Sequence, residues 1–289
     1  MEITKVAVLG AGLMGHGIAQ VAAQVAKSEV YLTDVKQEFL DKGLRMIDDS
    51  LGRFLRKGEL TESDRAEIKK RIHATLSPRE AVREADLVIE AAPEVAQLKC
   101  QLLFEVDKFA PQRTVIASNT SSISITMLAA ATKRPEMFCG MHFFNPPQLM
   151  KLVEIVRGVK TSDETVQIVK AFAEKMGKEI VIVKKDVPGF IVNRILLPAL
   201  NEAIFLVQEG VADPAEIDKA IKLGLNWPMG PITLLDYIGL DTTLSIANVL
   251  SEETGDPKYR ASSLLRQMVR AGLLGRKTGK GFYDWTEKK

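Results

Sequence analysis

The sequence has few of the features that mark a secreted, a membrane or a metal-binding protein. Its two cysteines, Cys100 and Cys139, lack the spacing of a disulfide framework, a redox motif or a metal site, so we expect no metal and a reducing, cytoplasmic location. No apolar run reaches the roughly 18 residues that cross a bilayer, which predicts no membrane partner. The 39 basic and 37 acidic residues are interspersed, so no basic stripe predicts nucleic-acid binding.

The N-terminal residues follow the pattern of a dinucleotide-binding unit. Residues 3–10 are rich in β-branched side chains and predict a buried parallel strand, and residues 17–26 predict a helix whose first N–H groups would face phosphates. Between them lies a glycine-rich turn, in which the glycines permit a tight bend, close approach of a pyrophosphate and close helix packing. The turn residues expected to bind the cofactor are Gly10, Gly12, Leu13, Met14 and Gly15.

Asp34 follows the second predicted strand, residues 29–33, about twenty residues beyond the last glycine. A carboxylate at this point accepts hydrogen bonds from both ribose hydroxyls and repels the additional phosphate of NADP. The sequence therefore predicts NAD as the cofactor, a preference that the nearby Lys36 tempers. A glycine motif alone is a weak signal, but strand, turn, helix, strand and acid in this order form a strong one.

His142 and Glu154 are the candidate catalytic residues. His142 lies in an aromatic and proline-rich segment that resembles a loop at the end of a strand, and Glu154 lies in a stretch that alternates like a half-exposed strand. Alone, His142 is better explained as a core histidine, and Glu154 could equally be a surface glutamate. Imidazole exchanges a proton near neutrality, and a carboxylate on its far nitrogen would fix its orientation. Beside a dinucleotide site, the pair predicts a dehydrogenase.

The order of the patterns predicts an α/β domain followed by an all-α domain. Strand-like runs recur at residues 86–91, 114–118, 152–156 and 179–183, so we predict a doubly wound, Rossmann-type NAD-binding domain over residues 1–185. Residues 37–72 have helical spacing and mixed charge, which predicts an inserted helical hairpin. Helical patterns alone follow, which predicts a C-terminal domain over residues 186–289.

Six motifs together resemble the L-3-hydroxyacyl-CoA dehydrogenases, including the bacterial 3-hydroxybutyryl-CoA dehydrogenases, over essentially the whole chain. The motifs are GAGLMG at 10–15, ASNTSS at 117–122, HFFNPP at 142–147, DVPGFIVNR at 186–194, PMGPI at 228–232 and GRKTGKGFY at 275–283. The resemblance implies an NAD-dependent oxidoreductase that interconverts (S)-3-hydroxyacyl-CoA, with short acyl chains favoured, and 3-oxoacyl-CoA. It also implies a homodimer formed through the helical domain, whose long apolar faces agree with that expectation.

The same resemblance implies the roles of the catalytic residues. His142 and Glu154 form a dyad, in which the histidine removes the proton of the 3-hydroxyl while C3 passes hydride to the nicotinamide. Ser121 and Asn193 are neutral donors that hold substrate oxygens, and neutral donors can bond both the hydroxyl and the ketone.

The cofactor and substrate contacts implied by the resemblance lie in four other parts of the chain. Glu94 and Lys99 correspond to a pair on the ribose side of the cofactor, and Ser121 and Asn145 to donors near the nicotinamide. Lys277 corresponds to a lysine that reaches the cofactor from the helical domain.

The predicted hairpin carries the argument for an acyl-CoA substrate. Ser50 and Lys57 correspond to CoA contacts and are two helical turns apart, so both are expected on one helix face, and Ser121 is expected to contact the substrate as well. Two alternatives stay open. Relatives of this fold oxidise free hydroxy acids such as L-gulonate or carnitine without a CoA-contacting hairpin, and the chain could also be a non-catalytic NAD-binding module.

Overall fold

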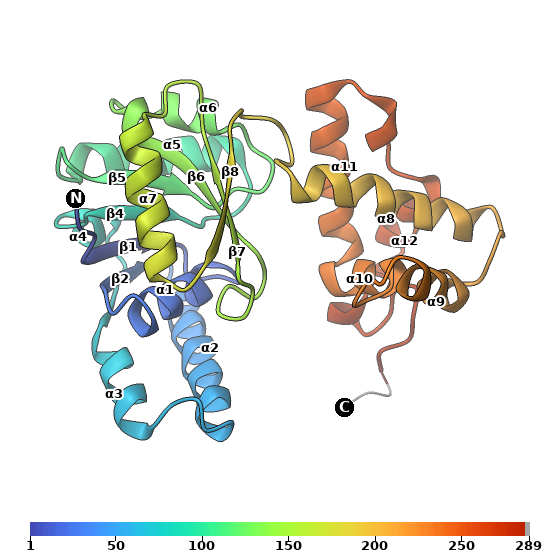
Figure 1. Cartoon of the computed structure of the whole chain (residues 1–289), viewed down its shortest axis with the longest axis horizontal. Coiled ribbons are helices and arrows are strands. Elements are labelled where there is room, and N and C mark those ends of the chain that lie inside the picture. The colour runs from blue at the N-terminus through green and yellow to red at the C-terminus, as the bar shows by residue number, and fades with distance from the viewer. Residues whose placement is uncertain (287–289) are drawn as a thin grey trace. The chain divides into compact units, whose positions relative to one another are not determined.

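The computed structural model describes residues 1–286, so residues 287–289 of the predicted helical domain lie outside the description. The chain separates into two compact units, Met1–Val187 and a second unit that starts at Pro188. Strands and helices alternate in the first unit, and helices follow one another in the second (Figure 1). This organisation confirms the predicted fold class, a Rossmann-type α/β domain followed by an all-α domain.

An eight-stranded sheet forms the centre of the first unit. Its strands are β1 Lys5–Leu9, β2 Glu29–Thr33, β3 Ile72–Thr75, β4 Leu87–Glu90, β5 Val115–Ser118, β6 Phe138–Phe143, β7 Leu152–Val156 and β8 Glu179–Val183. They lie in the order β3-β2-β1-β4-β5-β6-β7-β8, and every neighbouring pair is parallel except β6 and β7. The winding reverses between β1 and β4, and such a sheet binds ligands at the carboxyl ends of the strands beside that point.

The central strands are buried because their side chains are apolar on both faces. Every residue of β4 and β5 is buried, and Val6, Val8 and Ile89 are fully enclosed. Burial of one such aliphatic side chain contributes roughly 1.5–3 kcal/mol relative to exposure, so the strands supply much of the unit's stability. The polar exceptions, Glu90 and Ser118, are the last residues of their strands and lie at the edge where ligands bind.

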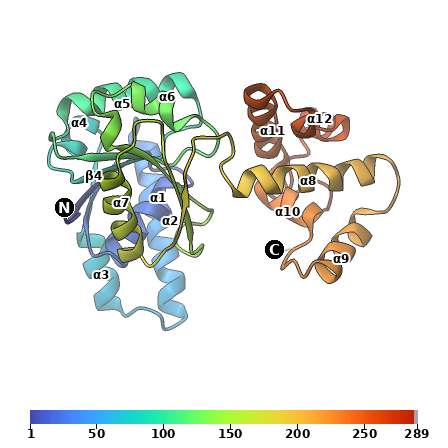
Figure 2. The same cartoon turned by 45° about the horizontal axis from the view of Figure 1, so that its top comes forward.

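Seven α-helices surround this sheet. They are α1 Gly15–Gln24, α2 Gln37–Arg56, α3 Glu62–Lys70, α4 Pro78–Val82, α5 Ala96–Phe109, α6 Ile125–Ala130 and α7 Asp163–Lys175, with a 3₁₀ turn at Pro135–Met137. Side-chain caps from Thr61, Ser77, Ser124 and Ser162 begin four of them, each contributing about 1 kcal/mol. Helices α2 and α3 project from the unit as the predicted hairpin (Figure 2).

Two expectations about the strands that carry the candidate dyad were wrong. His142 itself is not in a loop, because it is the fifth residue of β6, which is buried throughout, and the loop begins only after Phe143. Strand β7 is not half-exposed, since Glu154 and its neighbours are buried as well. The neighbouring strands β6 and β8 leave β7 no exposed edge, and helix α7 packs against the strand.

The second unit is built from helices that follow one another along the chain. They are α8 Val192–Gln208, α9 Pro214–Gly224, α10 Pro231–Ile238, α11 Leu240–Thr254 and α12 Ser263–Arg270, with 3₁₀ turns at Pro257–Tyr259 and Arg276–Thr278. Pro214 and Pro231 start their helices, where a proline needs no intrahelical N–H bond. Gly255 ends α11 in the left-handed conformation that suits glycine.

The second unit has its own core and a fastened C-terminal segment. Its buried core includes Leu200, Ile204, Leu235, Leu250 and Leu265. The buried carboxylate of Asp236 accepts hydrogen bonds from the backbone N–H groups of Phe282 and Tyr283 and from Nε1 of Trp285. These bonds anchor the segment that contains Lys277. Within residues 1–286, no helix combines the length and the apolar character that a membrane span requires.

Candidate active site

The glycine-rich turn between β1 and α1 has the geometry that the fingerprint predicts. Gly10 adopts a positive φ of 105°, and a Cβ on Gly15 would stand 1.7 Å from the carbonyl oxygen of Gly10, so neither position accepts a larger residue. A Cβ on Gly12 would meet no atom within 4 Å. The second glycine therefore faces open space at the N-terminus of α1, which fits the close approach of a dinucleotide pyrophosphate.

The carboxylate of Asp34 is oriented by the backbone of this turn. Its Oδ2 accepts a hydrogen bond of 2.8 Å from the N–H of Ala11, and its Oδ1 accepts one of 2.7 Å from the N–H of Val35. Asp34 is half-buried directly after β2, which is the position expected of a residue that binds a ribose. The two other predicted residues of the glycine-rich turn follow Gly12. Leu13 is exposed, and Met14 is half-buried.

His16, in the first turn of α1, was not among the predicted site residues. Its ring is buried, and Nδ1 donates a hydrogen bond of 2.8 Å to the carbonyl oxygen of Gly12. Burial, and to a lesser degree the charge of Arg53, lowers the pKa of His16 from its ordinary value. A neutral imidazole thus braces the turn from within, and the sequence signal was a histidine directly after the last glycine of the motif.

His142 and Glu154 are brought together by the only antiparallel pair in the sheet of the described chain. They are direct partners in the register of β6 and β7, and Nδ1 of His142 lies 2.7 Å from Oε2 of Glu154. Both side chains are buried. Because an ionised carboxylate only accepts hydrogen bonds, Nδ1 carries the proton and Nε2 is directed away from Glu154. Nε2 lies 3.2 Å from Oγ of Ser121, which follows β5.

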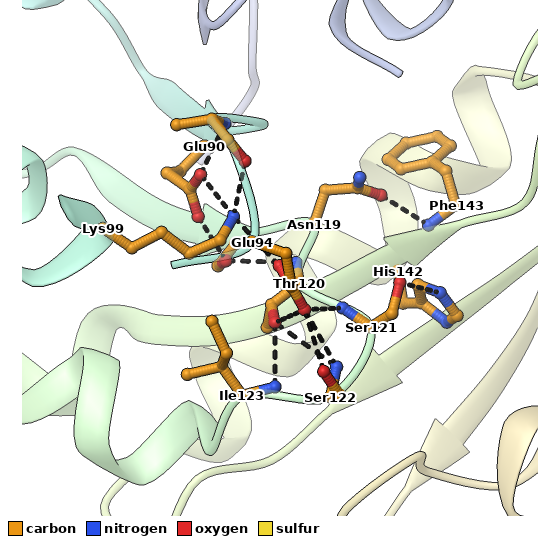
Figure 3. A network of polar contacts seen from close by, with 12 residues as sticks. Glu90, Glu94, Lys99, Asn119, Thr120, Ser121, Ser122, Ile123, His142 and Phe143 are labelled. Carbon is orange, nitrogen blue, oxygen red and sulfur yellow. Dashed lines mark hydrogen bonds and ion pairs between the residues drawn. The ribbon is translucent and has the colours of Figure 1, made fainter. Parts of the chain in front are cut away.

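The turn that carries Ser121 is held by the carboxylate of Glu94 (Figure 3). Oε1 of Glu94 accepts hydrogen bonds from Oγ1 of Thr120 at 2.6 Å and from the N–H groups of Ser121 and Ser122 at 2.9 and 3.1 Å. Burial works against the charged carboxylate, but the charge of Lys99 and these hydrogen bonds outweigh it and hold the pKa of Glu94 below its ordinary value. The carboxylate therefore stays ionised at neutral pH.

Lys99 is buried instead of being a solvated surface charge. Its Nζ lies 2.7 Å from Oε1 of Glu90 and 3.4 Å from Oε2 of Glu94. Glu90, the last residue of β4, was missed by sequence reasoning because an acid at the end of an apolar strand has no motif of its own. Asn119 connects the end of β5 to β6, the strand of His142, since Oδ1 of Asn119 accepts a hydrogen bond of 2.9 Å from the N–H of Phe143.

The two predicted CoA contacts, Ser50 and Lys57, lie in and just after helix α2 but differ in exposure. Ser50 is buried and accepts a hydrogen bond of 3.3 Å from Nε2 of Gln148. Lys57 follows the last residue of α2, is exposed, and lies 3.9 Å from Glu59. Asn145 is exposed in the loop that joins β6 to β7.

Two predicted site residues belong to the second unit. Asn193 is half-buried in the first turn of α8. Lys277 is exposed in the C-terminal segment, where its Nζ lies 2.5 Å from Oδ2 of Asp241 and beside Gly239. Among the described residues, no group of His, Cys, Asp and Glu side chains is arranged to hold a metal ion.

The fold and the cofactor site define the class of the protein. A doubly wound sheet, a glycine turn with open space over Gly12 and an acid directly after β2 are the features of a Rossmann-type oxidoreductase that uses NAD.

Comparisons with known proteins identify the family within that class. The model of the 3-hydroxyacyl-CoA dehydrogenase NAD-binding domain matches residues 5–187, and that of the C-terminal domain matches residues 189–285. The chain is 53% identical to a probable 3-hydroxybutyryl-CoA dehydrogenase of Deinococcus radiodurans, over 97% of this chain and 100% of the relative. The crystal structure of (S)-3-hydroxybutyryl-CoA dehydrogenase from Ralstonia eutropha superposes with a TM-score of 0.93 at 48% identity, covering 99% of this chain and 100% of that one.

The chain belongs to the 3-hydroxyacyl-CoA dehydrogenase family. The resemblance carried by the six motifs is thereby confirmed, as are NAD as the cofactor and the prediction of an enzyme instead of a non-catalytic binding module.

Proposed function

We propose that the protein interconverts (S)-3-hydroxybutyryl-CoA and acetoacetyl-CoA with NAD, in the metabolism of butyrate and other short fatty acids. The observation that carries the proposal is the buried contact of 2.7 Å between His142 and Glu154, at the same end of the sheet as the glycine turn. Relatives named for this reaction at 53% and 48% identity over nearly the full chain support the choice of substrate.

In the proposed mechanism, His142 acts as the general base for oxidation of the alcohol. Bound NAD supplies the hydride acceptor. Nε2 of His142 takes the hydroxyl proton as the hydride leaves C3, and it returns that proton when the ketone is reduced. The imidazole becomes positive in the oxidation step, and the buried carboxylate of Glu154 stabilises that charge while keeping the ring oriented. The antiparallel register that pairs the two residues supports this assignment.

Ser121 and Asn193 are proposed to hold the substrate oxygen. The Oγ of Ser121 lies 3.2 Å from Nε2 of His142, so an oxygen placed beside the two groups could contact both. A hydroxyl group both donates and accepts, which lets Ser121 bond the alcohol and the ketone in turn. For Asn193, as for Asn145 beside the nicotinamide, the support is the match to the family motif.

The proposed cofactor contacts begin at the open space over Gly12. There the backbone of the turn would face the pyrophosphate and Asp34 the ribose hydroxyls. Glu94, Ser121 and Lys277 complete the proposed set, and Lys99, whose side chain is buried, would act on the cofactor through Glu94. On the hairpin, Ser50 and Lys57 are proposed to contact the CoA portion of the substrate, and the exposed ammonium of Lys57 supports a contact with phosphate.

We further propose a cytoplasmic homodimer that associates through the second unit. The free thiols Cys100 and Cys139 agree with a reducing compartment. Exposed apolar side chains on the second unit, among them Val211, Leu223 and Leu225, support a surface that a second copy would cover.

The proposed reaction is tested by the reduction of acetoacetyl-CoA, followed through nicotinamide absorbance with NADH and NADPH in parallel and with L-gulonate plus NAD as a control. We expect rapid turnover with NADH, and a loss of at least 100-fold in kcat for His142→Gln, since general acid–base catalysis contributes about 10²–10⁴-fold. Turnover of L-gulonate alone would assign a free hydroxy acid as the substrate. Near-normal turnover by His142→Gln would show that His142 is not the general base.

A further inference from the structure

A buried carboxylate without an assigned role lies next to the site. Glu90 has no exposed surface, and each of its oxygens is bonded. Oε1 accepts the N–H of Ala92 at 2.6 Å and Nζ of Lys99 at 2.7 Å, and Oε2 accepts Oγ of Ser118 at 2.5 Å. Glu90 thus joins the ends of β4 and β5 to helix α5.

Lys99 connects this carboxylate to Glu94. An ammonium has three N–H donors, and Nζ of Lys99 has three oxygen partners, which are Oε1 of Glu90, the carbonyl of Ala92 at 3.0 Å and Oε2 of Glu94 at 3.4 Å. The side chain of Lys99 is only 2% exposed. Its effect on the cofactor side of the site must therefore pass through Glu94.

The carboxylates of Glu90 and Glu94 compete for the ammonium of Lys99, and the distances show which of them binds it more closely. Glu90 is the nearer partner, at 2.7 Å against 3.4 Å. Glu94 is consequently left with Oε1 for the turn of residues 120–122, where Thr120, Ser121 and Ser122 donate to it (Figure 3). If Glu90 lost its charge, Lys99 would be attracted to Glu94 alone, and the hold of Glu94 on that turn would weaken.

We propose that Glu90 is a positioning residue of the dehydrogenase. By keeping Lys99 close to itself, Glu90 leaves the Glu94 carboxylate free to shape the turn that directs Oγ of Ser121 at Nε2 of His142. This inference rests on the proposed function, because it assumes that Ser121 and His142 meet the reacting oxygen. A displacement of about 1 Å in such a group costs on the order of 100-fold in rate, so a residue outside the first contacts can control turnover.

The chain offers a matched control for a purely structural role. Asp107 and Arg134 form a second buried ion pair, in which Nε of Arg134 lies 2.6 Å from Oδ1 of Asp107. Asp107 belongs to α5, the same helix as Lys99. Asp107→Asn therefore breaks a buried pair of the same kind on the same helix, away from Ser121. If Glu90 matters only for stability, Glu90→Gln and Asp107→Asn should behave alike.

The experiment compares Glu90→Gln, Asp107→Asn and the charge-conserving variant Glu90→Asp with the wild-type chain. Melting temperature, NADH affinity by fluorescence, and kcat and KM for acetoacetyl-CoA are measured well below every melting point. We expect Glu90→Gln to lose at least tenfold in kcat/KM, and Asp107→Asn less than twofold. Glu90→Asp should lose less than Glu90→Gln, because its carboxylate still competes with Glu94 for the ammonium of Lys99.

The outcomes separate this proposal from the function on which it rests. Equal kinetic losses in Glu90→Gln and Asp107→Asn would overturn the positioning role. Normal turnover by His142→Gln would instead overturn the proposed function, while changes in NADH affinity would still report whether Glu90 shapes the cofactor side.

Discussion

We propose that the charge of Asp34 governs the choice of cofactor. We predict that Asp34→Asn, which keeps the shape but removes the charge, lowers the NADH to NADPH ratio of kcat/KM by on the order of tenfold, because a repulsion worth about 1.4 kcal/mol disappears. The measurement is acetoacetyl-CoA reduction with both cofactors. Glu164→Gln, the same charge change at an exposed position of α7, serves as control. A ratio equal to that of the control would refute the role of Asp34.

At the same scale, the sequence reveals which residue types are present but not which of them are buried. The glycine turn and Asp34 could be predicted because their spacing along the chain is fixed by one turn and one helix. The contact of His142 with Glu154, in contrast, depends on the pairing of two strands. The lowered pKa of Glu94 depends on the charge of Lys99 and on hydrogen bonds from the turn of residues 120–122. Glu90 was missed for the same reason, since its partner Ser118 lies on another strand.

At the scale of elements, β6 was missed because its glycine resembles a break. Gly140 lies in the middle of the strand, where a Cβ would stand 2.8 Å from Cδ1 of Ile125 and 2.9 Å from Cβ of Val156. The glycine serves close packing against α6 and β7, not a turn. Strand β3 was missed because it is short and partly exposed at the edge of the sheet, so it has no apolar run that marks a strand.

The loop between β6 and β7 is held by one buried lysine. Nζ of Lys178 donates to the carbonyl oxygens of Pro147 and Met150 at 2.5 and 2.8 Å, and burial lowers the pKa of Lys178 from its ordinary value. We predict that Lys178→Met lowers the free energy of unfolding by about 1–3 kcal/mol for each carbonyl left buried without a donor. The KM for NADH should also rise several-fold, because the same loop carries Asn145.

Denaturant unfolding and steady-state kinetics test the role of Lys178. The control is Lys175→Met, which removes an exposed lysine at the end of α7, where its Nζ lies 3.5 Å from Oε1 of Glu2. Exposed ion pairs contribute about 0–1 kcal/mol, so the control should stay near the wild type. If the two variants unfold at the same denaturant concentration with the same KM, Lys178 does not hold the loop.

At the scale of the whole molecule, each unit has a core of its own. The second unit exposes Val211 at 63%, Leu223 at 78% and Leu225 at 62%, around the start and the end of α9. Stable interfaces bury about 1,200–2,000 Å² with an apolar centre, and exposed aliphatic side chains at the ends of a helix supply apolar surface for such a centre.

We therefore predict that Leu223→Asp, alone or with Val211→Asp, converts a dimer into a monomer at micromolar concentration, because a charge buried in an apolar interface costs several kcal/mol and each 1.4 kcal/mol weakens association about tenfold. Light scattering after size exclusion gives the mass. Val159→Asp is the matched control, since Val159 is 84% exposed on the first unit and should leave the dimer intact. A wild-type mass that stays that of one chain at every concentration would rule out the homodimer, and dissociation by Val159→Asp would place the interface on the first unit instead.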